Sequence, residues 1–195
     1  MKPAVFLDRD GTMVHDVGYL SRREDLQWYP WTIDAIRMLN RAGFLVCVTS
    51  NQGGIGLGVC TVPFVEATHR EMDETIAASG GRIDGWYYCP HHPRAVTDEL
   101  RVACRCRKPE PGMIERASRE HPIDLSRSFV VGDKMADVGL GTRAGATSIL
   151  VRTGHGEREY ARHGGAVPGA AHVATDLMDA TSWILERLEG RAGAR

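Results

Sequence analysis

Short, continuous apolar segments alternate along this chain with segments in which apolar residues recur every three or four positions. Continuous apolar runs of this length are typical of strands buried on both faces, and the three-to-four spacing is typical of helices with one apolar face. We predict strands at 4–7, 44–48, 83–88, 129–131 and 148–151. We predict helices from about 33 to Gly43, from Thr61 to Gly80, from Pro111 through Ala117, and through Met178 to Leu188.

This alternation predicts an α/β fold: a Rossmann-like, doubly wound parallel sheet with helices on both faces. Ligands bind such sheets beyond the carboxyl ends of the strands. We find no internal repeat, and expect one domain over residues 1–190 with a frayed tail at 191–195. The segment 154–171 is rich in glycine, alanine and charged residues, and we predict a mobile loop there.

Carboxylates follow two of the predicted strands. Asp8 and Asp10 come directly after the first strand, and Asp133 comes after the fourth. Carboxylate oxygens suit Mg²⁺, which needs few protein ligands because it keeps several waters. One carboxylate can attack phosphorus, and its neighbour can carry the proton. An isolated Asp-x-Asp-Gly is more often a solvated turn, so this interpretation depends on the other clusters.

Two further clusters fall where they can complete a phosphate site. Ser50 follows the second strand and begins the segment Ser50-Asn51-Gln52-Gly53, whose hydroxyl and amides can hold phosphoryl oxygens. Lys108 can neutralise a phosphate, while Arg107 can grip a second anionic group. Asp137 lies one helical turn beyond Asp133 and can support it. Each cluster alone is also typical of an ordinary turn or a solvated loop.

Three of the five cysteines cluster with histidines. Cys89 precedes the pair His91-His92, and Cys104 and Cys106 follow after a loop. Three thiolates and one imidazole form a closed tetrahedral set typical of structural zinc, which leaves no open position for chemistry. The alternative is a set of buried cysteines near a loop histidine. Such a zinc site would order the loop 89–106, which ends just before Arg107. We expect Cys47 and Cys60 to be core or loop residues.

The four clusters in this order resemble the haloacid dehalogenase superfamily of phosphohydrolases. The resemblance rests on Asp-x-Asp-x-Thr at 8–12, a hydroxyl residue after the second strand, a lysine, and Gly-Asp-x-x-x-Asp at 132–137, and spans about residues 4–151. It implies that Asp8 is the nucleophile and Asp10 the general acid and base. It also implies that Ser50 and Lys108 hold the phosphoryl group. Asp8, Asp133 and the backbone carbonyl of Asp10 would then bind Mg²⁺.

Four segments, 6–12, 88–93, 104–113 and 131–134, resemble a narrower family, the capless, zinc-containing heptose 1,7-bisphosphate 7-phosphatases. That resemblance implies removal of the C7 phosphate from a precursor of lipopolysaccharide or another surface glycan. It favours His91 as the fourth zinc ligand, and gives Arg107 the sugar or the distal phosphate. The implied substrate-site residues are Asp16, Val17, Gly18, Tyr19, Ser50, Asn51, Gln52 and Gly53. One departure is that 56–58 lacks an expected basic residue.

Several alternatives stay open. A histidinol-phosphate phosphatase shares the aspartate motif and the zinc loop, and Asp16 or Glu24 could meet its cationic substrate. A second rival is a broader sugar-phosphate phosphatase. A rival of another class is a zinc-stabilised binding module that has lost catalysis, but the intact Asp8, Asp10, Lys108 and Asp133 argue against it. The formal net charge is −1, and no basic stripe or long apolar run indicates a nucleic-acid or membrane partner. Without a recognisable signal peptide, we expect a cytoplasmic monomer acting on a small sugar phosphate.

Overall fold

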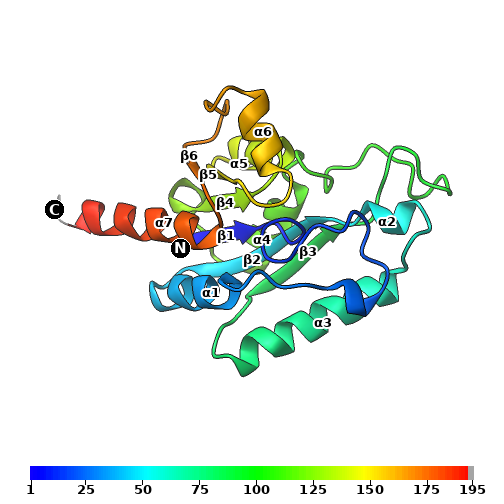
Figure 1. Ribbon diagram of the computed structural model, residues 1–195, viewed down its shortest axis with the longest axis horizontal. Helices are drawn as coiled ribbons and strands as arrows, with labels where there is room; N and C mark the ends of the chain where they lie inside the picture. Colours follow the sequence, from blue (N-terminus) through cyan, green and yellow to red (C-terminus); the bar gives the residue numbers. More distant parts are fainter. Residues whose placement is uncertain (193–195) are drawn as a thin grey trace.

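The computed structural model describes residues 1–192, which form one six-stranded sheet with helices on both faces (Figure 1). The sheet order is β3-β2-β1-β4-β5-β6, and every neighbouring pair is parallel. The strands are β1 Ala4–Leu7, β2 Leu45–Asn51, β3 Gly85–Cys89, β4 Phe129–Gly132, β5 Thr147–Val151 and β6 His172–Ala174. The chain runs outward from β1 to β3, then restarts at β4 on the other side of β1. This reversal confirms the doubly wound topology and creates a switch point between β1 and β4.

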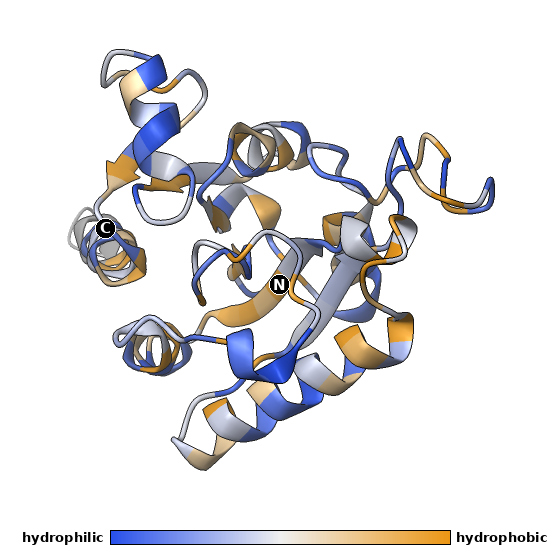
Figure 2. Ribbon diagram, turned by 45° about the vertical axis from the view of Figure 1, so that its right-hand side comes forward, coloured by the Kyte–Doolittle hydropathy of each residue, from blue (hydrophilic) through white to orange (hydrophobic). Residues whose placement is uncertain are grey.

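The helices include five of nine or more residues. These are α1 Thr32–Arg41, α3 Val62–Ala78, α4 Gly112–Glu120, α5 Met135–Ala144 and α7 Leu177–Ala192. Two shorter helices are α2 Gly53–Gly56 and α6 Gly156–Arg162, and single 3₁₀ turns span Arg23–Asp25 and Leu125–Arg127. Hydrophobic and hydrophilic residues alternate around the turns of these helices (Figure 2). None of the helices in residues 1–192 is both long and apolar enough to cross a membrane.

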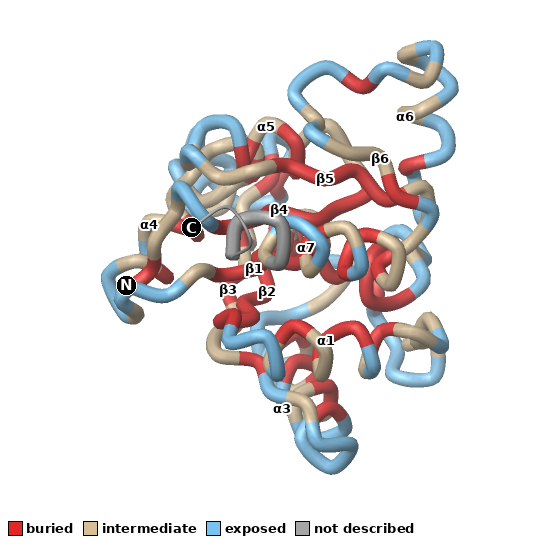
Figure 3. The backbone as a smooth tube through the Cα atoms, turned by 90° about the vertical axis from the view of Figure 1, so that its left-hand side faces the viewer, coloured by how far each residue is buried: buried red, intermediate tan, exposed pale blue. Residues whose placement is uncertain are grey.

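The core forms because successive side chains of each strand point to opposite faces. Val5 and Leu7 of β1 pack with residues of α1, α3 and α7, whereas Ala4 and Phe6 pack with residues of α4 and α5. All four are fully buried. Burial is concentrated in the strands and the inner helix faces (Figure 3). The sheet is therefore a rigid platform whose carboxyl ends can hold functional side chains.

The predicted strands and helices are confirmed, with small shifts at their ends. β2 extends to Asn51 beyond the predicted end at 48. α3 begins where predicted, because the Thr61 side chain accepts a hydrogen bond from the backbone N–H of Phe64 at 3.3 Å. α7 continues through Ala192, past the predicted domain end at 190. The rest of the predicted frayed tail, 193–195, lies outside the described residues.

The prediction of a mobile loop over 154–171 is wrong for part of the segment. It contains α6, and the strand β6 follows it. Tyr160 of α6 packs against a small cluster that includes Val138, Leu150 and Val167. The Arg152 guanidinium lies over the Tyr160 ring at 4.6 Å from its centroid. These contacts of Tyr160 hold the helix against α5 and β5.

Candidate active site

Acidic side chains from β1, β4 and α5 meet at the carboxyl edge of the sheet. Asp8 follows β1, Asp133 follows β4, and Asp137 lies in the first turn of α5. All three are buried, and one carboxylate oxygen from each lies within 4.8 Å of the others. The Asp8 backbone N–H donates to the Val131 carbonyl at 2.9 Å, which ties the end of β1 to β4. The structure thus brings Asp8 and Asp133 together, with Asp137 behind them.

Lys108 supplies the positive charge within this cluster. Its Nζ lies 2.6 Å from Asp8 Oδ1 and 2.5 Å from Asp137 Oδ1, and it donates to the Thr49 carbonyl at 2.9 Å. Burial alone would lower the pKa of Lys108, but the Asp137 and Asp8 carboxylates raise it overall. The Asn51 side chain accepts from the Lys108 backbone N–H at 3.0 Å and donates to its carbonyl at 3.3 Å. Lys108 is therefore charged and held in place.

The buried Asp133 carboxylate is less fully balanced by nearby positive charge than Lys108 is by its carboxylates. Burial, together with the Asp8 carboxylate, raises the pKa of Asp133 to about 8. Its Oδ2 accepts from the His155 backbone N–H at 2.7 Å, but its Oδ1 accepts no hydrogen bond within residues 1–192. Gly11 and Gly154 approach this carboxylate so closely that a Cβ on either would overlap it. A buried carboxylate oxygen without a donor, beside Asp8, fits a hard divalent cation such as Mg²⁺.

Asp10 lies beside this cluster, and its side chain is 16% exposed. Gln52 Nε2 donates to Asp10 Oδ2 at 3.0 Å and to Ser50 Oγ at 2.7 Å. Arg9 Nη2 donates to Asp10 Oδ1 at 2.9 Å. Both oxygens of the Asp10 carboxylate therefore accept hydrogen bonds from buried side chains, which fix the orientation of the carboxylate.

A cavity of about 420 Å³ opens over these groups. The predicted site residues that line it are Asp8, Asp10, Asp16, Gly18, Tyr19, Ser50, Asn51, Arg107 and Lys108. Val17, Gln52 and Gly53 do not line it: Val17 is 46% exposed, and the other two are buried. Gln52 instead sits behind Asp10. A larger cavity of about 590 Å³, between α3 and β3, contains none of the predicted site residues.

Sequence reasoning missed a lysine and a histidine at the cavity entrance. Lys134 Nζ lies 2.9 Å from Asp16 Oδ2 and 3.4 Å from Asp133 Oδ1, and His155 Nε2 lies 3.1 Å from Asp16 Oδ2. Although burial opposes it, the Lys134 hydrogen bond and charge lower the pKa of Asp16. The position of Lys134, directly after the predicted metal ligand Asp133, could have indicated that it lies at the site. His155 gave none, because its segment was predicted to be a loop.

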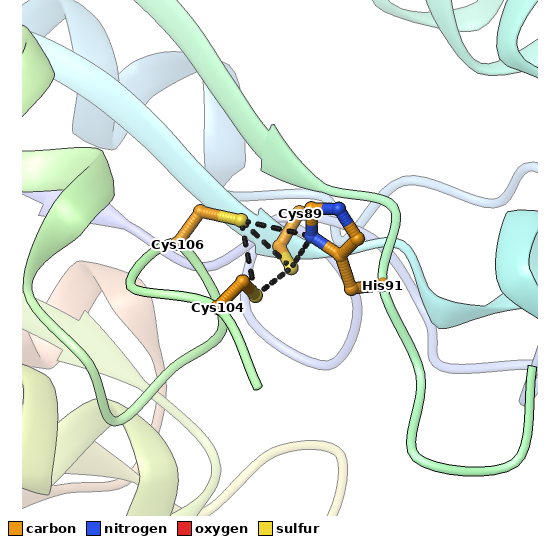
Figure 4. A group of neighbouring side chains, drawn as sticks. All are labelled: Cys89, His91, Cys104 and Cys106. Atoms are coloured by element: carbon orange, nitrogen blue, oxygen red, sulfur yellow. Dashed lines mark hydrogen bonds between the residues drawn. The ribbon is translucent and has the colours of Figure 1, made fainter. Parts of the chain in front are cut away.

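A second cluster lies at the end of β3 and in the loop that joins it to α4 (Figure 4). Cys106 Sγ lies 3.2 Å from Cys89 Sγ, 3.3 Å from Cys104 Sγ and 3.2 Å from His91 Nδ1. Cys89 Sγ lies 3.5 Å from Cys104 Sγ. Zn–S bonds of about 2.3 Å in a tetrahedron separate the sulfurs by roughly 3.8 Å, slightly more than the separations here. The Cys/His cluster is therefore consistent with a zinc loop.

The cluster contains His91 and not His92, as the family resemblance implied. The His92 ring is turned elsewhere, and its Nδ1 accepts from the Arg94 backbone N–H at 3.1 Å. Cys47 is fully buried within the sheet and Cys60 is partly buried, which confirms that both lie outside the cluster.

Comparisons with known proteins agree with this geometry. Residues 105–180 match the HAD-hydrolase-like family model. The chain is 40% identical, over 97% of its length and 99% of the relative, to a D-glycero-D-manno-heptose-1,7-bisphosphate 7-phosphatase from Thermosynechococcus vestitus. It is 42% identical, over 78% of its length and 80% of the relative, to D-glycero-beta-D-manno-heptose-1,7-bisphosphate 7-phosphatase from Escherichia coli K12.

Among solved structures, D,D-heptose 1,7-bisphosphate phosphatase from B. bronchiseptica, complexed with magnesium and phosphate, superposes with a TM-score of 0.84. Its sequence is 31% identical, and the match covers 96% of this chain and 99% of that one. The corresponding protein from Burkholderia thailandensis is 30% identical, with a TM-score of 0.68 over 96% and 99% of the two chains. These similarities extend over nearly the whole chain. The chain therefore belongs to the D-glycero-D-manno-heptose-1,7-bisphosphate 7-phosphatase family of haloacid dehalogenase-like, magnesium-dependent phosphatases.

Proposed function

We propose that this chain hydrolyses the C7 phosphate of D-glycero-D-manno-heptose 1,7-bisphosphate through an aspartyl-phosphate on Asp8. The observation that carries the proposal is the pairing of Lys108 with Asp8 on the floor of a cavity that Asp10 also lines. A carboxylate nucleophile and a proton carrier thereby face the same space, with a cation ready to meet phosphoryl oxygens. The names of the relatives supply the substrate.

The first half-reaction transfers the phosphoryl group to Asp8. A carboxylate oxygen of Asp8 attacks phosphorus, the bond between phosphorus and the C7 oxygen breaks, and protonated Asp10 gives its proton to that leaving oxygen. Lys108 and the Ser50 hydroxyl contact the phosphoryl oxygens. Asp8, Asp133 and the backbone carbonyl of Asp10 would hold Mg²⁺, which supplies further charge neutralisation.

The second half-reaction restores the enzyme. Asp10, now a carboxylate, takes a proton from a water that attacks phosphorus, and the bond to the Asp8 oxygen breaks. Inorganic phosphate leaves and Asp10 is again protonated. The side chain of Asp10 is partly exposed to the cavity while its two oxygens are oriented from behind. Both properties are needed by a group that serves as acid and then as base.

The charges at the cavity entrance favour a substrate with a second phosphate. Arg107 lines the cavity, and its Nη1 donates to the His91 carbonyl at 2.8 Å, which fixes the guanidinium beside the opening. Lys134 and His155 line the same opening. We propose that Arg107 contacts the sugar or the C1 phosphate. Electrostatic attraction between the charges of Arg107 and Lys134 and a bisphosphate would assist binding.

Histidinol phosphate fits this cavity entrance less well. Its ammonium group would need a free carboxylate, and Asp16 is already paired with Lys134 and His155. Glu24 does not line the cavity; its carboxylate lies 3.8 Å from the Arg22 guanidinium at an exposed position. Neither acidic residue therefore offers a ready partner for a cationic substrate.

We also propose that the Cys/His cluster binds one structural zinc ion. Its four ligand atoms converge within 4.8 Å and leave no open position. Zinc there would fix the loop that ends at Cys106, immediately before Arg107 and Lys108. Its role would be to place these two side chains, with no part in the chemistry.

The test is kcat/KM for phosphate release from both anomers of heptose 1,7-bisphosphate and from histidinol phosphate, with Asp8→Asn as the control. We expect a heptose anomer to be preferred over histidinol phosphate by about a hundredfold or more, or about 2.7 kcal/mol in transition-state binding. A preference for histidinol phosphate would refute the substrate and leave the mechanism intact. Normal turnover by Asp8→Asn would refute the mechanism.

A further inference from the structure

Arg9 is a buried charged side chain that the mechanism above does not use. It is only 1% exposed and is among the largest fully buried side chains of the chain. Its one ion pair within the described residues is with Asp10, at 2.9 Å. Burying a guanidinium is costly unless its donors find partners, so the partners of Arg9 show what the fold gains from it.

The donors of Arg9 divide between the site and the interior. Nε and Nη2 donate to Asp10 Oδ1 at 3.1 and 2.9 Å, and Nη2 also donates to Gln52 Oε1 at 3.1 Å. On its far side, Nη1 lies 3.3 Å from His69 Nε2. A guanidinium has only donors, so the His69 nitrogen must be the acceptor, and the imidazole must be neutral with its proton on Nδ1. Burial and the Arg9 charge lower the pKa of His69 to about 3, which agrees with a neutral ring.

His69 is itself held by aromatic residues of the edge strand. Its ring stacks on Trp86 with centroids 4.8 Å apart, and the Tyr88 ring meets it edge-on at 5.6 Å. The Trp86 indole donates to Asp73 Oδ1 at 3.1 Å, which ties β3 back to α3, the helix that carries His69. The imidazole therefore has little freedom to turn away from Arg9.

We propose that Arg9 and His69 are positioning residues for Asp10: the imidazole fixes the guanidinium, and the guanidinium fixes the carboxylate that transfers the proton. This rests on the proposed function, in which Asp10 is the general acid and base. A freely turning carboxylate spends less time in reach of the leaving oxygen, so loss of orientation lowers kcat more than it raises KM. The two residues act through Asp10 and do not touch substrate.

Two substitutions of His69 separate positioning from packing. His69→Phe keeps an aromatic ring against Trp86 but has no acceptor for Arg9, whereas His69→Gln loses the ring and keeps an acceptor at a similar reach. We expect His69→Phe to lower kcat about tenfold or more, with KM within about twofold, and His69→Gln to recover most of the rate. If His69 served only packing, His69→Phe would keep a higher kcat than His69→Gln. Glu66→Gln, which changes only the partner of the Tyr88 hydroxyl at the surface, is the matched control and should keep the wild-type rate.

The assay is steady-state phosphate release from heptose 1,7-bisphosphate by the zinc-loaded chain in saturating Mg²⁺, with folding checked by circular dichroism. If His69→Phe does not fold, His69→Leu takes its place against His69→Gln with the same expectation. A wild-type kcat in the variant without an acceptor, while Asp10→Asn is inactive, would overturn the positioning role alone. Normal turnover by Asp10→Asn would overturn the proposed role of Asp10, and the inference with it.

Discussion

The Lys108 ammonium group is the protein cation in contact with the buried carboxylates of Asp8 and Asp137, and its removal should be costly. Lys108→Met keeps the length of the side chain and removes its charge. Breaking a buried ion pair from one side destabilises a fold by about 3–5 kcal/mol, because the partner charge stays buried. Since Lys108 touches two carboxylates, we expect a loss at the upper end of this range near pH 7.5.

The loss should depend on pH in a defined direction. In the wild type the pKa of Lys108 is raised above its ordinary value, so its contribution is fully present at pH 5–8. In the variant, Asp137 loses the cation that lowers its pKa, while burial still raises it. A carboxyl group whose folded pKa lies above its unfolded value stabilises the fold at low pH, and this contribution is lost as pH rises through the window between the two values. The deficit should therefore be larger at pH 7.5 than at pH 5.

The measurement is the free energy of unfolding in urea at both pH values, with the zinc site loaded and no Mg²⁺ in the buffer, so that magnesium does not replace the lost charge. Lys108→Met/Asp137→Asn is the matched control, because it also removes one of the stranded carboxylates. It should be more stable than the single variant by about 1 kcal/mol or more. A deficit below about 1 kcal/mol, or one that grows toward pH 5, would refute this account of the buried pair.

Three other perturbations test the remaining parts of the site. Asp8→Asn should lower phosphate release by about a thousandfold or more because it removes the nucleophile, and the protein should still fold because Asp137 still pairs with Lys108. Cys104→Ser should reduce zinc, measured by elemental analysis after dialysis, from about one ion per chain to a small fraction. Gly11→Ala should destabilise the fold by about 1–3 kcal/mol and weaken activation by Mg²⁺ in a titration, since Gly11 has φ +93° and a Cβ there overlaps the Asp133 carboxylate.

The centre of the sheet could be predicted from the sequence because β1, β2, β4 and β5 are buried on both faces, so their residues form continuous apolar runs. β6 escaped prediction because it has only three residues, and its pairing with β5 is visible only in three dimensions. α6 escaped because its segment is rich in glycine and charge, and its one aromatic residue, Tyr160, packs against Val138 of α5 and Leu150 of β5, outside the segment. Elements that depend on contacts with distant residues are those for which a local pattern is least informative.

In the candidate site, too, some features follow from the local sequence and others depend on the surrounding structure. Asp8, Ser50 and Asp133 follow directly from their places at the ends of strands, where the topology must bring them together. The direction of a side chain does not follow in this way. Gln52 was predicted to line the substrate site, but it turns inward because Asp10 and Arg9 need partners there. A spacing rule locates a residue at the correct edge, and the demands of buried polar groups then decide where its side chain points.

The placement of Lys108 illustrates how these levels combine. Lys108 belongs to no strand, yet it reaches a buried position between two carboxylates, Asp8 after β1 and Asp137 in α5. Three consecutive residues hold the chain on this path. Cys106 joins the Cys/His cluster, Arg107 donates to the His91 carbonyl, and the Lys108 backbone is bonded on both sides by Asn51 at the end of β2. The loop thus directs the chain toward the site, and Asn51 of the sheet fixes the position of the Lys108 backbone. Because little apolar burial secures this loop, the cluster at its base is the feature that allows a loop lysine to be held as firmly as a residue of the sheet.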